Sequence, residues 1–448
     1  MTIYHQNSAC QLFLTVRFFW VFGAITVLFA AAYALPMLFP LAKAAFVLAL
    51  ALLVADGALL YASPPGIMAR RDTPPVWSLS DPNPVSIQLR HSGRQPFLID
   101  VYDDLPVQFQ ERDRVVQLVL KPGEQKVLER TLQPLSRGEY AFGNLHVFVA
   151  TTLGLVQRHL NIPQEDTVAV YPSIIQMKRY ELKAMQHIAH DSGIKKMRRI
   201  GHSYEFEQIK NYVQGDDYRS INWKASGRRG TLMVNQYEDE RSQQVYVVID
   251  KSRAMKMPFE GLSLMDYAIN TALALSNIIL KKQDKAGLLT FSNAIGATIK
   301  AERSGGQLNR ILDALYREKE RPGEANFELL YQAVRRLIGA RSLLILFTNF
   351  ESSYALERAL PILRRLNRAH LLVVVFFENT EIRRLAEETV SHTADVYRQT
   401  VARQFLHEKK EMVQKLRQYG IQSILTSPKD LTINTINKYL ELKSRGLI

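Results

Sequence analysis

VYVVIDKSRA, residues 245–254, is the stretch from which the fold of the C-terminal half can be inferred. Its first five residues are β-branched or aromatic, which is typical of a buried strand, and a polar loop begins at Asp250. A helix is predicted next, over residues 264–282, where apolar residues recur at helical spacing, and another apolar strand follows at 285–292. This alternation predicts βαβ units with parallel strands, whose ligand sites form at the carboxyl ends of the strands.

The same alternation continues to the C-terminus. Residues 285–292 and 295–302 are expected to pair as a short hairpin, and further strands are predicted at 342–349, 370–378 and 421–427. Helices are predicted at 306–317, 327–338, 354–368, 402–419 and 431–442. We therefore predict a doubly wound, Rossmann-like α/β domain over residues 244–448, with helices on both faces of a mostly parallel sheet.

Upstream lies the charged run GDDYRSINWKASGRRG, residues 215–230, which has no apolar face at helical or strand spacing. Its adjacent carboxylates should point apart in a turn or strand and no histidine follows nearby, so they form a poor acid/base pair. We expect a structural role, with a buried tryptophan anchoring a clamp between the β-rich segment and the α/β domain and a turn at residues 228–230. The residues assigned to this interaction or structural signature are Asp216, Asp217, Arg219, Trp223, Lys224, Arg228 and Arg229.

In residues 77–172, apolar and polar residues alternate with a period of two. Strands are indicated at 85–91, 96–104, 114–122 and 139–151, with Asp-Pro, Ser-Gly, Pro-Gly and Arg-Gly turn signals between them. This pattern predicts a small all-β sandwich over residues 71–175, in which Gly123 occupies a tight turn at positive φ. A basic linker and the signature segment, residues 176–243, connect the sandwich to the α/β domain.

Two apolar runs precede the sandwich. Residues 18–35 carry no charge, and residues 44–62 carry one acid, Asp56. Each run nearly spans a hydrocarbon core of about 30 Å, and the short break between them predicts an antiparallel transmembrane hairpin within residues 1–70. Asp56 could face the partner helix, lie near the interface or be tolerated without a role. The alternative is a cleaved signal peptide, with residues 30–34 resembling a processing site.

Charge predicts the orientation. Arg17 precedes the first run and Arg70 and Arg71 follow the second, whereas the connecting loop offers only Lys43. The positive-inside rule then predicts a multi-pass protein of the inner membrane with its soluble domains in the cytoplasm.

Composition limits the classes of partner. The 448 residues contain one cysteine, Cys10, which excludes an internal disulfide framework and a cysteine-rich zinc site. A net charge of +14 permits contact with nucleic acid or an anionic membrane. The signature segment mixes both signs of charge around a lone tryptophan, so no nucleic-acid partner is expected.

The order strand, DKSRA, helix, then LLTFS and a strand ending in FTN resembles a von Willebrand factor type A domain. That resemblance implies a Mg²⁺ site built from D-x-S-x-S, a threonine and a second aspartate. Asp250 and Ser252 match, but Ala254, Ala325 and Asn349 stand at the other three positions. A single carboxylate balances only part of the charge of a divalent cation, so we expect a vestigial site without metal or cofactor.

Other roles are then expected for the side chains of this loop. Asp250 and Ser252 should cap the loop and the first helix by hydrogen bonds. Partner binding should depend on neighbouring side chains that include Lys251 and Arg253, which place positive charge where a metal would lie.

The run from residue 204 to residue 240 is similar to the signature of a bacterial family, domain of unknown function 58. Members typically have two membrane helices, a β-rich segment and a type A-like domain, and are often encoded beside AAA+ ATPases of the MoxR type. The resemblance covers nearly the whole chain and names no reaction. It implies a membrane-anchored cytoplasmic protein-interaction module, not an enzyme, that partners a MoxR-type ATPase in assembly or maturation of other proteins. The alternative is a hydrolase that uses the acidic loop around Asp216 and Asp217, for which no base is evident.

Overall fold

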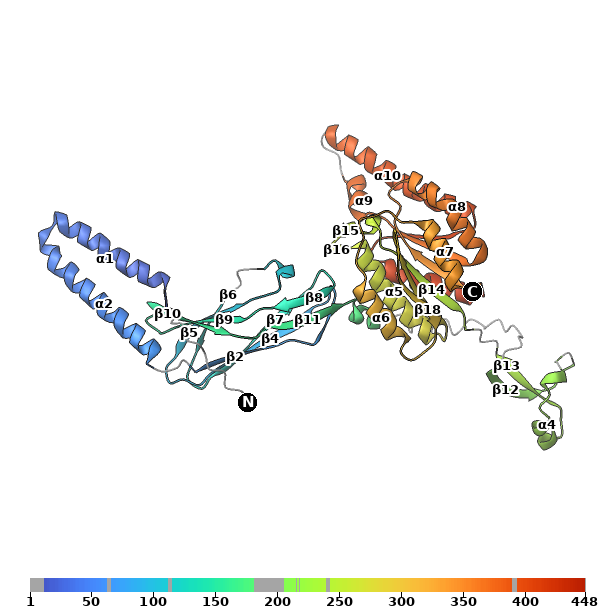
Figure 1. Cartoon of the computed structure of the whole chain (residues 1–448), viewed down its shortest axis with the longest axis horizontal. Coiled ribbons are helices and arrows are strands. Elements are labelled where there is room, and N and C mark those ends of the chain that lie inside the picture. Colours follow the sequence, from blue (N-terminus) through green and yellow to red (C-terminus); the bar gives the residue numbers. More distant parts are fainter. Residues whose placement is uncertain are drawn as a thin grey trace. The chain divides into compact units, whose positions relative to one another are not determined.

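The computed structural model describes residues 12–62, 66–111, 115–180, 205–214, 216, 218–238, 242–388 and 393–447 (Figure 1). Cys10, Asp217 and most of the basic linker lie outside the described residues. The chain forms two compact units, Met1–Tyr171 and Pro172–Ile448.

The first unit begins with a helical hairpin. Helix α1 (Val16–Ala34) and helix α2 (Phe39–Tyr61) are joined by the short 3-10 helix η1 (Pro36–Leu38). Thr15 caps α1, and its Oγ1 accepts a hydrogen bond from the Phe18 amide at 3.4 Å. Both helices are long and apolar enough to cross a membrane, and only 11% of each apolar stretch is buried. They therefore suggest membrane association.

The rest of the first unit is β-rich. A five-stranded sheet has the order β1-β10-β9-β5-β6, and two three-stranded sheets have the orders β2-β4-β7 and β3-β11-β8. The strands are β1 (Leu12–Leu14), β2 (Ile67–Asp72), β3 (Val76–Ser78), β4 (Asn83–His91), β5 (Phe97–Asp103), β6 (Val115–Leu120), β7 (Gln125–Leu132), β8 (Gly138–Phe142), β9 (Leu145–Ala150), β10 (Val156–Ile162) and β11 (Asp166–Tyr171), with the 3-10 helix η2 (Val107–Phe109) after β5.

Alternate side chains of these strands form one core. Ile87 and Leu89 of β4 meet Val147 and Val149 of β9, and Leu60 of α2 joins the same cluster. Two sheets thus share a core with the end of the hairpin. Gly123 has a φ of +76°, as expected for its turn. The segment predicted as one strand at 139–151 divides into β8 and β9, and six of the described strands were not predicted: β1, β2, β3, β7, β10 and β11.

The second unit contains the α/β sheet. Its order is β18-β17-β14-β19-β20-β21, and every strand is parallel to its neighbours except β18, which forms the expected antiparallel hairpin with β17. The parallel-strand sheet that the alternating pattern predicted is therefore confirmed. Its strands are β14 (Gln244–Asp250), β17 (Lys285–Phe291), β18 (Ile295–Glu302), β19 (Leu343–Phe347), β20 (Leu371–Phe377) and β21 (Gln422–Thr426).

Helices cover both faces of this sheet. Val245, Val247 and Ile249 of β14 point to one core, and Tyr246 and Val248 point to the other. The first core includes α5 (Leu264–Lys281), α6 (Gln307–Arg317) and α11 (Leu431–Ser444). The second includes α7 (Phe327–Leu337), α8 (Ser353–Ala369) and α10 (Thr393–Gln418), while α9 (Thr380–Glu387), η4 (Arg253–Met255), β15 (Pro258–Phe259) and β16 (Leu262–Ser263) lie in connections. Both faces of β14 are buried, which explains its continuous apolar run.

The charged run of the signature segment belongs to a small hairpin module. Strand β12 (Glu205–Asn211) pairs antiparallel with β13 (Met233–Glu238), and η3 (Tyr218–Ser220) and α4 (Trp223–Arg229) lie between them (Figure 1). Asn222 caps α4 by accepting a hydrogen bond from the Ala225 amide at 3.0 Å, and Gly230 ends it at a φ of +70°. Residues 228 and 229 are therefore helical, which corrects the predicted turn.

Candidate functional site

The loops at the carboxyl edge of the α/β sheet are organised around Asp250. This residue is 1% exposed at the end of β14. Its Oδ1 accepts a hydrogen bond from the Ser252 amide at 2.8 Å, and its Oδ2 accepts one from Thr348 Oγ1 at 2.7 Å. Burial raises the pKa of Asp250, and the bonds from Thr348 and Ser252 oppose that rise. The carboxylate thus ties the loop after β14 to the end of β19.

The expected capping is only partly present. Asp250 caps its own loop as predicted, but Ser252 begins η4 without a side-chain capping bond. Helix α5 is capped instead by Ser263, which forms a capping box with Asp266. The prediction for the first helix was wrong because η4 and the β15–β16 hairpin separate the loop from the helix.

Lys251 is buried beside this loop. Its Nζ lies 2.5 Å from Glu318 Oε2, and the side chains are 4% and 9% exposed. Glu318 Oε1 also accepts hydrogen bonds from Thr290 Oγ1 at 2.6 Å and from the Ala297 amide at 2.8 Å. Burial raises the pKa of Glu318, but the bonds from Lys251, Thr290 and Ala297 outweigh it, so the pKa is lowered. Lys251 is therefore a structural ion-pair residue, and our expectation that it contacts a partner was wrong.

A second buried lysine reaches the same edge from α10. Lys409 is 3% exposed, and its Nζ donates to Asn349 Oδ1 at 3.3 Å and to the Phe350 carbonyl. The side-chain Nδ2 of Asn349 in turn donates to the Ala254 carbonyl at 3.3 Å. Burial lowers the pKa of Lys409 to about 8, although Glu351 and Glu408 partly offset this effect. The asparagine that replaces the expected second aspartate is thus bonded to a cation of the chain itself.

This set of side chains does not fit a divalent cation. Both Asp250 oxygens accept hydrogen bonds within the loops, and the alanines at positions 254 and 325 offer no side-chain oxygen. The ammonium of Lys409 on Asn349 adds a like charge where a metal would need a negative ligand. Within the part of the chain that the structure describes, three or more His, Cys, Asp or Glu side chains nowhere gather as a metal site.

Exposed charges surround this buried centre, and we name them the charged rim: Arg253, Glu324, Glu351 and Arg358. Arg253 Nη2 lies 3.9 Å from Glu324 and 3.8 Å from Glu351, and Arg358 Nη2 lies 3.0 Å from Glu324. These side chains are 58–61% exposed. The Arg253 amide also donates to the Gly323 carbonyl at 3.0 Å, so a backbone contact joins the loop of Arg253 to the segment that carries Glu324.

The signature module presents a different surface. Trp223 is 72% exposed, so the predicted buried anchor was wrong. Helix α4 is joined to β13 by a polar contact, in which the Met233 amide donates to Ser226 Oγ at 2.9 Å. The cations of the signature, Arg219, Lys224, Arg228 and Arg229, are also exposed. The clamp between domains stays a prediction.

Asp216 serves the hairpin loop. Its carboxylate accepts hydrogen bonds from Lys210 Nζ at 2.8 Å and from the Val213 amide at 3.0 Å. These two bonds, that from Lys210 first, lower the pKa of Asp216. A carboxylate so stabilised is a weak general base, and Asp217 lies outside the described residues. The hydrolase alternative stays a hypothesis without a described base.

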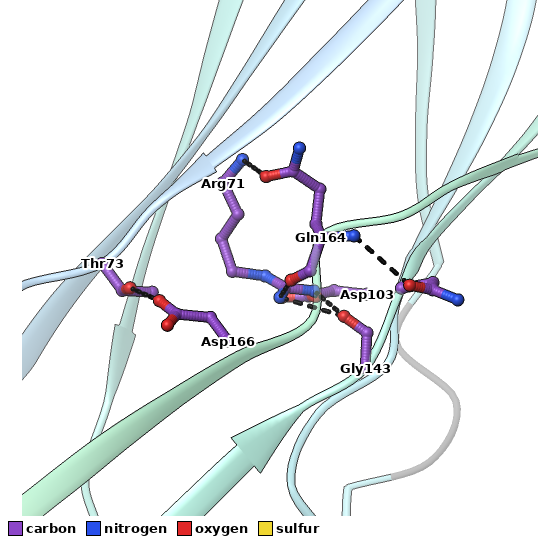
Figure 2. A network of polar contacts seen from close by, with 7 residues as sticks. Arg71, Thr73, Asp103, Gly143, Gln164 and Asp166 are labelled. Atoms are coloured by element: carbon purple, nitrogen blue, oxygen red, sulfur yellow. Dashed lines mark hydrogen bonds and ion pairs between the residues drawn. The ribbon is translucent and has the colours of Figure 1, made fainter. Parts of the chain in front are cut away.

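A polar network in the β-rich unit was not predicted (Figure 2). Arg71 forms a buried ion pair with Asp103, with side chains 2% and 6% exposed, and donates to the carbonyls of Gly143 and Gln164 at 3.1 and 3.0 Å. Burial raises the pKa of Asp103, and Arg71 opposes that rise. A surface hollow of about 580 Å³ lies beside the network and is lined by Arg70, Arg71, Pro163, Gln164, Glu165 and Asp166. The guanidinium faces the protein interior, so the network joins turns of the sandwich.

Asp56 of α2 also has a defined role. It is fully buried, and its carboxylate accepts hydrogen bonds from Thr151 Oγ1 and from the amides of Leu155 and Val156 at 2.8 and 3.0 Å. It faces the sandwich rather than the partner helix. The sequence left open whether Asp56 faces the partner helix, lies near the interface or has no role, and it could not identify partners so far along the chain.

Two comparisons of the sequence match parts of the chain. Residues 208–388 match the family model described as "Protein of unknown function DUF58". "Uncharacterized protein YeaD" from Bacillus subtilis (strain 168) is 29% identical over 120 residues, which cover 27% of this chain and 30% of that protein. The chain therefore matches less than a third of the length of this relative.

Solved structures show weak likenesses. The CARDB domain of PF1109 from Pyrococcus furiosus has 16% identity and a TM-score of 0.17, covering 23% of this chain and 94% of that one. The conserved hypothetical protein BatB from Bacteroides thetaiotaomicron has 12% identity and a TM-score of 0.25. The match covers 31% of this chain and 68% of that one. Such low TM-scores support no assignment of fold. The match over residues 208–388 and the Bacillus relative together support the relationship of this chain to the DUF58 family of unknown function.

Proposed function

We propose that this chain is a membrane-anchored protein-interaction module, not an enzyme, whose C-terminal domain is von Willebrand type A-like with a side-chain replacement for the metal site. The observation that carries the proposal is the contact of Lys409 with Asn349 and Phe350. A buried cation held by the sheet-edge loops supplies positive charge without a metal. Its hydrogen bonds join α10 to the loop after β19, whereas catalysis would need reactive groups that are open to a substrate.

The charged rim is the binding face in this proposal. Its four side chains alternate in sign and are more than half exposed, and the Arg253 amide is bonded to the Gly323 carbonyl. Such a surface suits a polar protein partner, for which complementary charges provide specificity and speed association. We propose a MoxR-type AAA+ ATPase as that partner, in the assembly or maturation of other proteins. The support for this choice is the resemblance of the signature segment to a family whose members are often encoded beside such ATPases.

Binding of the full chain to the purified ATPase tests the proposal. Detergent-solubilised protein is immobilised through a tag, and the dissociation constant is measured for wild type, Arg253→Glu and Arg358→Glu. Reversing one rim charge should weaken binding about tenfold, because like charges then face each other across the interface. Arg310→Glu is the matched control, since Arg310 lies on α6 with 63% of its side chain exposed.

Two results would contradict the proposal. Absence of binding by the wild-type chain would exclude this partner, and equal weakening by Arg253→Glu and Arg310→Glu would exclude the charged rim as the binding face. Orientation is tested separately with reporters fused to the C-terminus. The cations Arg17 and Arg70 outside the hairpin, against Lys43 within it, predict a signal from a cytoplasmic reporter. Activity of a periplasm-only reporter would refute that orientation.

A further inference from the structure

One loop of the β-sandwich, residues 151–156, is held by both ends of the helical hairpin. Thr15 Oγ1, at the start of α1, donates to the Gly154 carbonyl at 2.5 Å, and Arg17 Nη1 donates to the Leu153 carbonyl at 3.3 Å. Asp56, near the end of α2, accepts hydrogen bonds from two amides of the same loop. Hydrogen bonds from both helices therefore fix the position of this loop along the axis of the hairpin.

Strand register shows what else lies at this end of the sandwich. Gln157 and Leu98 both pair with Ala150, and Phe97 pairs with Leu120. In the facing sheet, His91 pairs with Ile67, just after the hairpin, and its carbonyl accepts the Gly123 amide at 3.0 Å. The turns at residues 92–96 and 121–124 thus lie at the same end as the loop, and we name the three segments together the proximal end.

The proximal end is cationic and has apolar side chains on its surface. Arg17, Arg90, Arg94 and Lys121 are exposed. The acid among its described turns, Glu124, is bonded to the Lys121 amide at 2.8 Å. Leu153 is 42% exposed, and Leu12, Phe13 and Leu14 of the adjoining strand β1 are 41–48% exposed. Basic side chains next to exposed apolar ones are typical of segments that contact anionic lipid headgroups.

The length of α1 places this end at the membrane surface. Its 19 residues extend about 28 Å at 1.5 Å per residue, close to the ~30 Å hydrocarbon core. Thr15 then lies at the boundary of the hydrocarbon, and the loop that it binds lies at headgroup level. We propose that the proximal end of the sandwich is a lipid-contact surface, in which residues 151–154 and strand β1 enter the headgroup region and the four cations bind anionic phospholipid. This proposal rests on the membrane anchoring proposed above.

Spin labels on the full chain test the proposal. In a Cys10→Ser background, single cysteines replace Trp20 of α1, Leu153 of the loop, or Leu135, which is 51% exposed beyond the opposite end of β7. The protein is reconstituted in phosphatidylcholine vesicles with about 30% phosphatidylglycerol, a content that gives a negative surface potential. Accessibility to oxygen and to a water-soluble nickel chelate is then measured for each label.

We expect oxygen to dominate at position 20, the nickel chelate at position 135, and intermediate values at position 153. An aqueous label at position 20 would refute the membrane hairpin and hence the proposed function. A lipid-exposed label at position 20 with equal aqueous values at 153 and 135 would leave the anchor intact and overturn the lipid-contact surface. Low access of both reagents to position 153 would indicate a protein contact there and would also overturn it.

The electrostatic part is tested with the label at position 153. A triple variant, Arg90→Ser, Arg94→Ser and Lys121→Ser, removes exposed cations of the proximal end, and Lys300→Ser, Arg335→Ser and Arg336→Ser is the matched control in the α/β domain. Adding phosphatidylglycerol should lower nickel access at position 153 about twofold or more in wild type and control, because headgroup attraction draws the loop inward. The triple variant should lose that response, and an unchanged response would overturn the role of the cations.

Discussion

Raising the pH from about 7 to about 9.5 should stabilise the α/β unit through Lys409. Burial lowers the pKa of this lysine from 10.5 to about 8. The folded chain therefore releases the proton near pH 8, whereas the unfolded chain keeps it until about pH 10.4. Between these values the unfolded state binds more protons, so the free energy of unfolding rises with pH. Below the folded-state pKa both states are charged, and the contribution of Lys409 is constant and unfavourable.

The size of the effect follows from the two pKa values. The separation between 10.5 and about 8 corresponds to at most about 3.4 kcal/mol, at about 1.36 kcal/mol for each tenfold change in the proton equilibrium. By about pH 9.5, the free energy of unfolding should have risen by roughly 2 kcal/mol. Keeping the pH below about 9.5 limits interference from tyrosines, whose usual pKa is about 10.

The assay is urea unfolding of a fragment that spans the second unit, Pro172–Ile448, followed by circular dichroism at several pH values. Wild type is compared with Lys409→Met, which removes the titrating group, and with Lys410→Met. Lys410 is the exposed neighbour on the same helix and serves as the matched control. The pH-dependent gain should appear in wild type and Lys410→Met and be absent in Lys409→Met. An equal gain in all three proteins would refute the assignment of Lys409 as a buried titrating cation.

Other substitutions test the structural residues. Asp103→Ala should cost the β-rich unit about 3–5 kcal/mol in urea unfolding, because Arg71 would be left buried without its carboxylate, and a loss below about 1 kcal/mol would show that the ion pair is unimportant. Gly296→Ala should lower the free energy of unfolding by about 1–3 kcal/mol, because a methyl group there would collide with Lys251 Nζ and its bonding partners. Unchanged stability would mean that these side chains can move aside. Trp223→Ala should change the free energy of unfolding by less than about 0.5 kcal/mol because the ring is 72% exposed, and a loss of several kcal/mol would contradict that exposure.

The α/β sheet could be predicted because its central strands, β14, β17, β19 and β20, are buried on both faces, which makes each of them a largely continuous apolar run. Helix α4 was missed although its signals are local, with Asn222 as the N-cap and Gly230 in the left-handed region. Its charged residues concealed a short helix whose stability comes from caps and from the bond between Ser226 and Met233, not from an apolar face.

The site was less predictable than the sheet. Asp250 ends β14 and Asn349 comes two residues after β19, so their loops could be placed at one edge from the order of elements. Glu318 could not be paired with Lys251, since 67 residues separate them and no local pattern marks the contact. Lys409 belongs to a helix rich in charge, where a lysine ordinarily faces solvent. Its burial depends on where α10 crosses the loops after β19, which is a tertiary property.

The bond between Asp56 and the sandwich has a consequence for synthesis of the chain. The groups that satisfy this carboxylate lie 95 to 100 residues farther along the sequence. At about 5–20 residues per second, a ribosome needs roughly 5–20 s to make that stretch. During this interval α2 exists with an acidic side chain that lacks its native partners. In the membrane anchor proposed above, the end of α2 is therefore expected to stay near water until the strand pair β9–β10 has formed and supplies the amides of Leu155 and Val156.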